Sequence, residues 1–555
     1  MPTQNLHNRL YTLTMLIAAI LVATGVVVGD AMHEVIGLWW WLGGLCVAIL
    51  VAVWTREERQ TVCDVAIVCG VVLLGGMRVA LSESDQQELN LPSEGVETGD
   101  EGGLKGISCE CVVLSEPVIR GKTAQFDGYV THSDRSFLND GYDLEGKKVR
   151  ISLLRDTITE HYKSIHLGTG LKVKADLSTL RERHHSGSNF SYLRWLRARG
   201  FVCRAFVPIG KWEQRDTDWG GLGVSQSVQL LALEGRQKIL ERLQRADMSA
   251  DAYSIAVAMT LGEKSSVTHE LREEYSVAGV SHILALSGTH LSVIYMLFML
   301  FVRKHRRRDN LPVLLFIWGY AFMAGLPISV VRASLMLSIF HLSHMSGRIQ
   351  NPFNVLGLTA VIMLLLSPES LWDVGFQMSF TAVASIYLFQ PIIQEQMPPS
   401  LQRQPKKIER QQKASVVRRK RIGRKVWEMC GMTISAQIGT APLTAYYFGR
   451  FTLYFLLANV VVLPVSTVVI GMMLCLVVLC VADMLSGGLL MIFVDGMAWI
   501  VSSVVSLLNW FVSAIAGLPG ASIEDIDLNV WQVGLLYVML GCVYRLCRMF
   551  LKPRM

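Results

Sequence analysis

Hydrogen-bonding and titratable side chains interrupt an apolar stretch near the middle of the chain. Residues 278–291 read Ala-Gly-Val-Ser-His-Ile-Leu-Ala-Leu-Ser-Gly-Thr-His-Leu, and an apolar segment continues from there to Phe301. Polar side chains inside a membrane span are costly to bury and need partners or a wet cavity. The two histidines, His282 and His290, flank the pair Ser287-Gly288. The pattern predicts a polar route or site within the bilayer, although both histidines could also be core residues satisfied by their neighbours.

Arg332 is the most costly of four further polar residues that lie within apolar sequence. A guanidinium stays charged in any protein, and at mid-span it costs roughly 2.5 to 3.5 kcal/mol on insertion scales. We expect Arg332 to line a pore or cavity, unless it snorkels to the interface from its position near Pro327. The other three residues are the amides Gln377, Gln437 and Asn459. Such amides could instead hydrogen-bond between helices that small residues such as Gly288 bring close together.

The composition places the chain among membrane proteins. Of its 555 residues, 51% are hydrophobic and 17% are charged, whereas soluble proteins carry about 25% charged residues. The apolar runs are at 10–29, 35–54, 62–81, 283–302, 311–326, 328–345, 352–367, 371–393, 427–448, 452–482, 487–511 and 529–550. The first run lacks a small-x-small cleavage site and is expected to be an anchor. We expect a polytopic α-helical membrane protein of about 12 transmembrane helices with a small extracytoplasmic β-barrel insert.

The net charge of +7 is concentrated in three basic segments, at residues 303–308, 403–425 and 545–554. Short cytoplasmic loops are enriched in Lys and Arg, so these segments predict the cytoplasmic side. Contact with DNA or lipid would be an added role for them. Residues 82–101 carry several acids and neither Lys nor Arg, which fits the outer side. The charges therefore predict that both termini are cytoplasmic.

Four regions follow along the chain. We expect N-terminal transmembrane helices at 1–81, an extracytoplasmic domain at 82–215, a connector at 216–250 with a helix at 234–245, and a second transmembrane region at 251–555. Alternating apolar residues predict β-strands at 107–113, 125–131, 147–153, 171–177 and 201–207. A helix at 192–199 would end at Gly200. Five strands with one helix before the last favour a small barrel of the oligonucleotide-binding (OB) type.

Such a barrel could hold single-stranded DNA through cations along the backbone and aromatic faces under the bases. The candidate DNA-binding residues are Lys172, Lys174, Arg194, Arg197 and Arg199, with Tyr192 and Trp195 as aromatic partners. Alternatively, Tyr192 and Trp195 pack the helix onto the barrel and the arginines are solvated.

Motifs for metal or nucleotide chemistry are incomplete in this sequence. The eleven cysteines have no metal-ligand spacing, and most lie in apolar runs. Cys203 could pair with Cys109 or Cys111 in the outer domain, which would leave one thiol over. Gly121-Lys-Thr123 lacks the leading glycine of a phosphate-binding loop, because Glu116 stands there. We expect no enzyme activity, no metal and no cofactor.

Several separate motifs resemble the ComEC-type DNA internalization competence proteins. The pattern Gly-x-Ser-His-x-x-x-x-Ser-Gly-x-His is matched from Gly279 to His290. Further pieces follow in family order, at Arg332-Ala333, at 375–380, at 436–450 and at Asn459 before Pro464. The resemblance covers residues 250 to about 480. Family members often have Asn-Pro-Gly-x-Phe-Asp-Tyr before the barrel helix; residues 186–192 read Ser-Gly-Ser-Asn-Phe-Ser-Tyr here, without the Pro and the Asp.

The resemblance implies a channel in the bacterial inner membrane that takes up single-stranded transforming DNA during natural competence. The residues that it implies for the lining are His282, Ser287, Gly288, His290, Arg332, Gln377, Gln437 and Asn459. Each phosphate that enters against a negative-inside potential costs about 2.3 kcal/mol per 100 mV, so we expect a separate cytoplasmic motor or strand-binding proteins, besides surface DNA-capture machinery. Many members carry a metallo-β-lactamase-like C-terminal domain; its His-x-His-x-Asp-His cluster does not occur in this sequence, and we expect no built-in nuclease.

Two other functions fit the same residues. A multipass transporter or enzyme acting on another anionic or envelope substrate would also use buried polar groups, but its activity would not depend on DNA. A scaffold of an uptake complex predicts that Arg332→Ala or His290→Ala leaves transformation intact.

Overall fold

The computed structural model describes residues 13–32, 35–55, 60–87, 104–133, 144–156, 160–179, 192–216, 220–301, 310–345, 351–402 and 414–550. The basic segment 303–308, residues 403–413 and 551–554 of the other two basic segments, residues 88–101 of the acidic stretch and residues 186–191 lie outside this range. The chain divides into two units. Unit 1 contains residues 1–186, 190–238 and 357–373, and unit 2 contains residues 187–189, 239–356 and 374–555.

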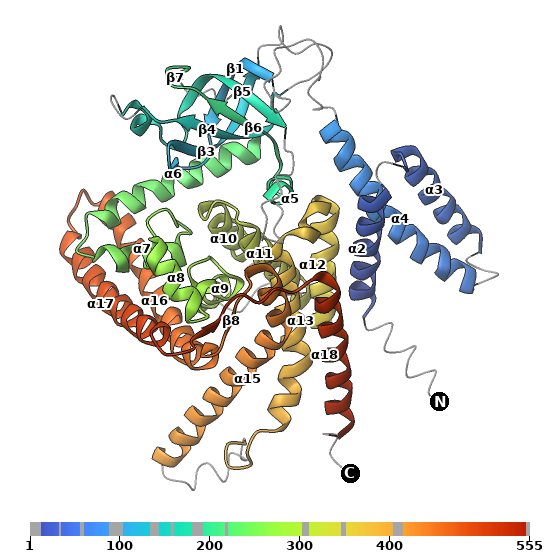
Figure 1. Ribbon diagram of the computed structural model, residues 1–555. Coiled ribbons are helices and arrows are strands. Elements are labelled where there is room, and N and C mark those ends of the chain that lie inside the picture. Colours follow the sequence, from blue (N-terminus) through green and yellow to red (C-terminus); the bar gives the residue numbers. More distant parts are fainter. Residues whose placement is uncertain are drawn as a thin grey trace. The chain divides into compact units, whose positions relative to one another are not determined.

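Unit 1 begins with three apolar helices, α2 (Thr14–Met32), α3 (Leu38–Thr55) and α4 (Gln60–Gln87), at the positions that the first three apolar runs predict (Figure 1). Glycines bring α2 and α4 into close contact. A Cβ added at Gly25 would lie 2.0 Å from the carbonyl oxygen of Val72, and one added at Gly75 would lie 2.4 Å from that of Val22. Any larger side chain would therefore push the two helices apart.

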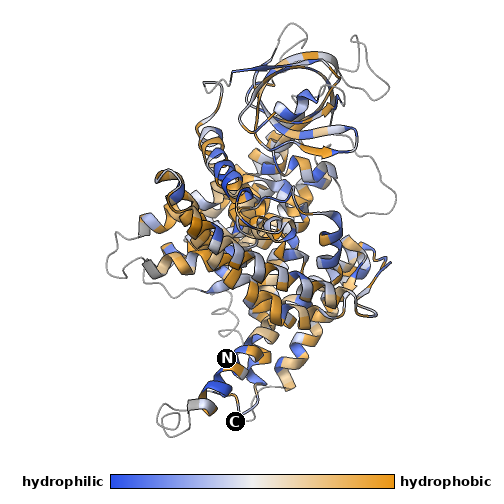
Figure 2. Ribbon diagram, turned by 90° about the vertical axis from the view of Figure 1, so that its left-hand side faces the viewer, coloured by the Kyte–Doolittle hydropathy of each residue, from blue (hydrophilic) through white to orange (hydrophobic). Residues whose placement is uncertain are grey.

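The strands of unit 1 are β1 (Leu104–Val113), β2 (Val118–Arg120), β3 (Thr123–Ser133), β4 (Lys148–Leu154), β5 (Gly170–Thr179), β6 (Phe201–Val207) and β7 (Trp212–Arg215). Five of them pair in the order β1-β3-β4-β6-β5, and β1 also pairs with β5, which closes the ring seen in Figure 2. The pairing of β4 with β6 is parallel and the others are antiparallel. This closed barrel is consistent with an OB-like domain.

The barrel core arises from the period of two along each strand. On β4 the side chains of Val149, Ile151 and Leu153 are buried and those between them are not. All five predicted strands are confirmed, and so is the helix, α5 (Tyr192–Arg197). The sequence reading missed β2 and β7, because these strands have three and four residues and no alternating burial.

A helical connector follows the barrel. The predicted helix at 234–245 is part of the longer α6 (Val224–Gln244), and α7 (Ala250–Thr260) and α8 (His269–Val277) come next. A short turn of 3-10 helix, η3 (Ser281–Ile283), leads into the apolar helices.

The apolar helices after the connector are α9 (Gly288–Phe301), α10 (Asn310–Met323), α11 (Ile328–Met345), α12 (Pro352–Leu366), α13 (Val374–Glu395), α15 (Ala414–Phe448), α16 (Phe455–Leu485), α17 (Met491–Ala516) and α18 (Val530–Phe550). The turn η5 (Pro368–Trp372) follows α12, whose larger part belongs to unit 1. Two short strands, β8 (Phe451–Thr452) and β9 (Ser522–Ile523), pair with each other in unit 2.

Within the described residues, seven helices are long and apolar enough to cross a bilayer, namely α2, α3, residues 61–82 of α4, α13, α16, α17 and α18. Shorter apolar segments lie in α9, α10, α11 and α12. A helical membrane protein with a barrel insert is therefore confirmed, whereas the expected number of about 12 crossings stays a prediction. Figure 2 shows these helices to be mostly hydrophobic.

Candidate polar site among the membrane helices

The polar motif before α9 forms the N-terminal cap of that helix. Ser287 precedes the first helical residue, and its Oγ accepts a hydrogen bond from the backbone N–H of His290 at 3.4 Å. The Ser287 hydroxyl also shares a hydrogen bond of 2.6 Å with the hydroxyl of Thr289. Serine at this position satisfies a backbone donor that has no partner inside the helix. Part of the predicted polar cluster thus positions α9.

A glycine holds the preceding turn in place. Gly279 has a φ of +78°, and a Cβ added there would lie 2.6 Å from Oγ1 of Thr452 next to α16. Only glycine combines this backbone conformation with so close a contact at little cost. The turn that leads to η3 and α9 is therefore fixed against β8.

The two histidines of the motif lie in different environments. His282 is exposed. His290 is 3% exposed, and its Nδ1 has no hydrogen-bond partner among the described residues. A buried nitrogen without a partner carries a desolvation cost. Of the two histidines, His290 therefore has the unused hydrogen-bonding capacity inside the helices.

Arg332 lies where α9, α11 and α13 meet. A Cβ added at Gly288 on α9 would lie 3.3 Å from Cβ of Ala333, the residue after Arg332 on α11. Arg332 is 6% exposed, and its Nη1 donates a hydrogen bond of 3.0 Å to the carbonyl oxygen of Gly375 in the first turn of α13. Its guanidinium carbon is 6.0 Å from the ring centroid of Phe380. The guanidinium is thus packed between helices rather than extended along an exposed face.

Gln377 is held by the neighbouring helix α15. Its Oε1 accepts a hydrogen bond of 2.9 Å from the hydroxyl of Tyr447. About two turns further along α13, Ser385 donates to the carbonyl oxygen of Ser435 at 2.6 Å. A Cβ at Gly439 would lie 2.5 Å from Cβ of Ser385. The α13–α15 contact is therefore a tight seam of small and polar residues, as expected for helices that associate in lipid.

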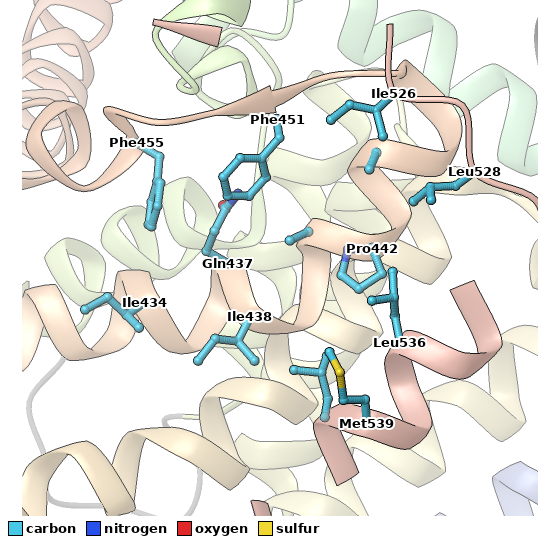
Figure 3. A pocket seen from close by; sticks show the side chains of 13 residues that line it. Ile434, Gln437, Ile438, Pro442, Phe451, Phe455, Ile526, Leu528, Leu536 and Met539 are labelled. Atoms are coloured by element: carbon cyan, nitrogen blue, oxygen red, sulfur yellow. The ribbon is translucent and has the colours of Figure 1, made fainter. Parts of the chain in front are cut away.

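Gln437 and Asn459 are separate from that seam. Gln437 lines a pocket of about 420 Å³ whose other lining residues are apolar (Figure 3). Asn459 lies in the first turns of α16 and is 6% exposed, and its Oδ1 has no hydrogen-bond partner among the described residues. The structure brings Ser287, Gly288 and Arg332 together, and connects Arg332 to the α13 segment that carries Gln377.

Sequence reasoning missed a second polar contact between α9 and α11. The hydroxyl of Tyr295 lies 3.3 Å from Nδ1 of His341, and both side chains point into the helix packing. Nearby, Nε1 of Trp318 on α10 donates to Oγ of Ser338 at 3.2 Å. The sequence does contain a sign of this contact, because His341 interrupts the apolar run 328–345 in the same way as Arg332.

In the barrel domain, two of the predicted DNA-binding arginines are engaged in unit 1. Nη2 of Arg194 lies 3.2 Å from Oδ2 of Asp30, and its guanidinium covers the ring of Trp372 at 4.6 Å. Nη1 of Arg199 lies 3.7 Å from Oδ2 of Asp373. These two arginines therefore tie α5 to α2 and to the turn η5.

The aromatic candidates form a stack with arginines at both ends. The rings of Tyr192 and Trp195 are 5.4 Å apart and nearly parallel. Arg204 lies 4.7 Å above Tyr192, and Arg199 lies 3.8 Å from the centroid of Trp195. Such cation–π contacts favour this arrangement. Both ring faces at the ends of the stack are covered by guanidinium groups.

The remaining DNA-binding candidates are Lys172 and Lys174 on β5, and Arg197 on α5. Lys174 is exposed, and Lys172 and Arg197 are half-buried. Lys172 lies opposite Glu110 on β1 and Glu213 on β7 in the strand register. Opposite charges across a strand pair attract each other, so Lys174 is the more available lysine.

The three cysteines of the barrel face its core as free thiols. Burial raises the pKa of Cys109 and of Cys203 to about 12. A thiolate is disfavoured away from water. These thiols are therefore protonated and unreactive near neutral pH.

The comparisons with known proteins concern mainly the helices that hold this polar site. Residues 259–550 match the family model described as Competence protein. ComE operon protein 3 of Bacillus subtilis (strain 168) is 25% identical over 220 residues, which are 39% of this chain and 25% of that protein. Competence protein ComA of Neisseria gonorrhoeae is 24% identical over 165 residues, which are 27% of this chain and 24% of that protein.

A third relative, an uncharacterized protein of Aquifex aeolicus (strain VF5), is 28% identical over 155 residues, which are 28% of this chain and 37% of that protein. The aligned segments thus span a quarter to about a third of these relatives. No solved structure gives a significant match. Because the family model matches more than half of the 555 residues, the chain belongs to the Competence protein family.

Proposed function

We propose that this protein lets one strand of transforming DNA cross the cytoplasmic membrane. The proposal is supported by the family match over residues 259–550 and by the similarity to proteins named for competence. The observation that carries it is Arg332, a permanent positive charge that is 6% exposed among apolar helices. Such charges inside a membrane region mark routes for ions or substrates. A single strand of DNA carries one negative charge per nucleotide, which a guanidinium complements.

The neighbours of Arg332 suit a transient partner for phosphate. Its guanidinium donates a hydrogen bond to the neutral carbonyl oxygen of Gly375. A hydrogen bond to a neutral carbonyl oxygen is weaker than one to an anion. A passing phosphate could therefore take its place. The contact of Gly288 with Ala333 keeps α9 and α11 close to this position in the resting state.

In this proposal the barrel makes the first contact with the strand and the helices conduct it. Lys174 is exposed, whereas Arg194 and Arg199 have acidic partners. We therefore assign the first contact with the DNA strand to Lys174. Arg194 and Arg199 hold α5 in place instead. The strand must be drawn inwards by a separate motor or by cytoplasmic strand-binding proteins, since each phosphate meets a cost of about 2.3 kcal/mol per 100 mV.

The test separates DNA capture at the surface from its arrival in the cytoplasm. A deletion strain is complemented with the intact gene, with Arg332→Gln, or with Arg272→Gln as a control at an exposed arginine. We expect the deletion and Arg332→Gln to capture labelled DNA normally and to lose its arrival, because the buried charge is gone. Arg272→Gln should behave as the intact protein. Equal arrival with and without the gene would overturn the proposal.

A loss of DNA arrival in the Arg332→Gln strain supports the proposal only if the variant protein is inserted in the membrane. The amount of each variant in the membrane is therefore measured in the same cells. Arg332→Lys keeps the charge without the planar group, and we expect it to restore part of the arrival. If Arg332→Gln is present at the normal level and transports normally, the protein acts as a scaffold or on another substrate.

A further inference from the structure

The pocket at Gln437 has a chemistry unlike that of a DNA route. Its volume is about 420 Å³, and twelve of its thirteen lining residues are apolar, Gln437 being the exception. The lining comes from the second half of α15, from the start of α16 and from α18, and Figure 3 shows Pro442 and Ile438 facing Leu536 and Met539. Water gains few hydrogen bonds in such a space, and a phosphate would find no cation there.

The polar groups of the pocket are gathered on one turn of α15. The side chain of Gln437 forms no hydrogen bond with any described residue. Pro442 lies inside α15, and a proline has no N–H to offer the carbonyl oxygen four residues earlier, which here belongs to Ile438. An amide and a carbonyl oxygen thus lie beside an apolar space.

The pocket opens onto a surface that faces lipid. Helix α18 is one of the spanning helices and leaves almost all of its length exposed. Met539 lines the pocket and is also 52% exposed, and its neighbours Leu535 and Val538 are 70% and 64% exposed. In a bilayer this face of α18 is covered by acyl chains. The same chains therefore have direct access to the space between α15 and α18.

We propose that one acyl chain of a bilayer phospholipid occupies this pocket between α15 and α18. The chain lies against Pro442 and Ile438, and its ester end is near the free amide of Gln437. The apolar lining, the access from the lipid-facing side of α18 and the unused amide all fit this occupant. The bound lipid is a component of the folded protein that is distinct from any transported strand.

Photo-crosslinking of the full-length protein in lipid nanodiscs tests the proposal. The nanodiscs contain a phospholipid with a photoactivatable diazirine in one acyl chain, and the crosslinked peptides are located by mass spectrometry. We expect labels on residues 434–445 and on Leu536, Met539 and Leu540 in excess of those on the outward positions Leu535 and Val538. Equal labelling of inward and outward positions of α18 would contradict the proposal.

Variants that fill the pocket supply the control. Ala441 lines it, and Ala441→Phe should reduce the pocket labels at least fivefold. Val468→Phe adds a ring at a 54% exposed position of α16 and should leave them unchanged. Ala445→Leu, a smaller change at the same wall, is used if Ala441→Phe is not recovered as a monodisperse protein. Undiminished labels in a folded pocket variant, or their displacement by a single-stranded oligonucleotide, would overturn the proposal.

Discussion

The barrel and the membrane helices both have apolar cores but differ in the polar side chains that they bury. The barrel core contains apolar residues such as Phe126 and the thiols, whereas charged pairs such as Arg150 and Asp127 keep contact with solvent. Among the membrane helices, Arg332, His290 and Asn459 are buried together with the apolar residues. The medium around each region determines where polar side chains are stable. Water solvates polar groups at the surface, whereas hydrocarbon does not. These polar residues of the helices are therefore directed inwards, and Arg332 among them donates a hydrogen bond to the carbonyl oxygen of Gly375.

The largest expected effect concerns the thiols of the barrel at alkaline pH. Burial raises the pKa of Cys109 and of Cys203 from 9.0 to about 12. Above pH 9 the unfolded chain releases these protons and the folded barrel retains them, so the free energy of unfolding falls as the pH rises from 9 to 12. The loss approaches about 1.4 kcal/mol per pH unit for each thiol.

Alkylation of the full-length protein followed by mass spectrometry detects the opening of the barrel that this loss favours. We expect Cys109 and Cys203 to stay unmodified at pH 8 and to react steeply above pH 9. Rapid labelling of the barrel thiols at pH 8 would show that the barrel interior is open to water.

The next effect tests how tightly the helices pack. In Gly439→Ala the new Cβ would lie 2.5 Å from Cβ of Ser385, so α13 and α15 must separate. Overpacking of this kind costs about 1–3 kcal/mol, and we expect a clearly lower thermal midpoint in detergent. Gly541→Ala on α18 is the matched control, because no atom lies within 4 Å of its added Cβ. Equal midpoints for the two variants would contradict the tight seam.

A smaller effect is expected for Tyr447→Phe, which removes the hydroxyl that donates to Gln377. The Gln377 oxygen then loses this partner, and since this side chain is half-buried we expect a loss of about 1 kcal/mol. The control is Tyr544→Phe, because the ring of Tyr544 contacts Phe389 and Arg548. The thermal unfolding midpoints of the two variants are compared. A midpoint as high as that of the control would mean that the hydrogen bond contributes nothing to stability.

The smallest effect is expected for Asp30→Asn, the partner of Arg194. Both side chains are partly exposed, so removal of the charge should cost at most about 1 kcal/mol, and added salt should reduce the difference. The thermal unfolding midpoints of Asp30→Asn and of the unchanged protein are compared at low and at high salt. A large loss that salt does not change would show that this pair is shielded from solvent, as Arg332 is.

The regular elements could be predicted because each has its own periodicity. Five strands of alternating burial, the helix α5 and the long apolar helices occur where the sequence indicates them. The contacts between elements could not be predicted. Nothing near Gln377 in the sequence points to Tyr447, seventy residues later, and nothing near Arg199 points to Asp373. Such partners depend on how the helices pack, which local patterns do not encode.

In the candidate site, too, local features could be predicted from the sequence and contacts between elements could not. The motif around Ser287 marks a polar group of residues in the sequence, but its role as the cap of α9 appears only in the structure. The pocket at Gln437 was not foreseen, because its walls come from three helices and a loop that are far apart in the chain.

The closed ring of strands has a consequence for the order of events during synthesis. Strand β1 pairs with β5, and β4 pairs in parallel with β6 about fifty residues later. The first contact cannot form until β5 has been made, and the second cannot form until β6 has been made, so β1 and β4 each wait with an unpaired edge. Folds dominated by such distant pairings form slowly and are prone to aggregate in the meantime. A destabilising substitution in β6 would therefore reduce the yield of the whole barrel, whatever its effect on the stability of the folded protein.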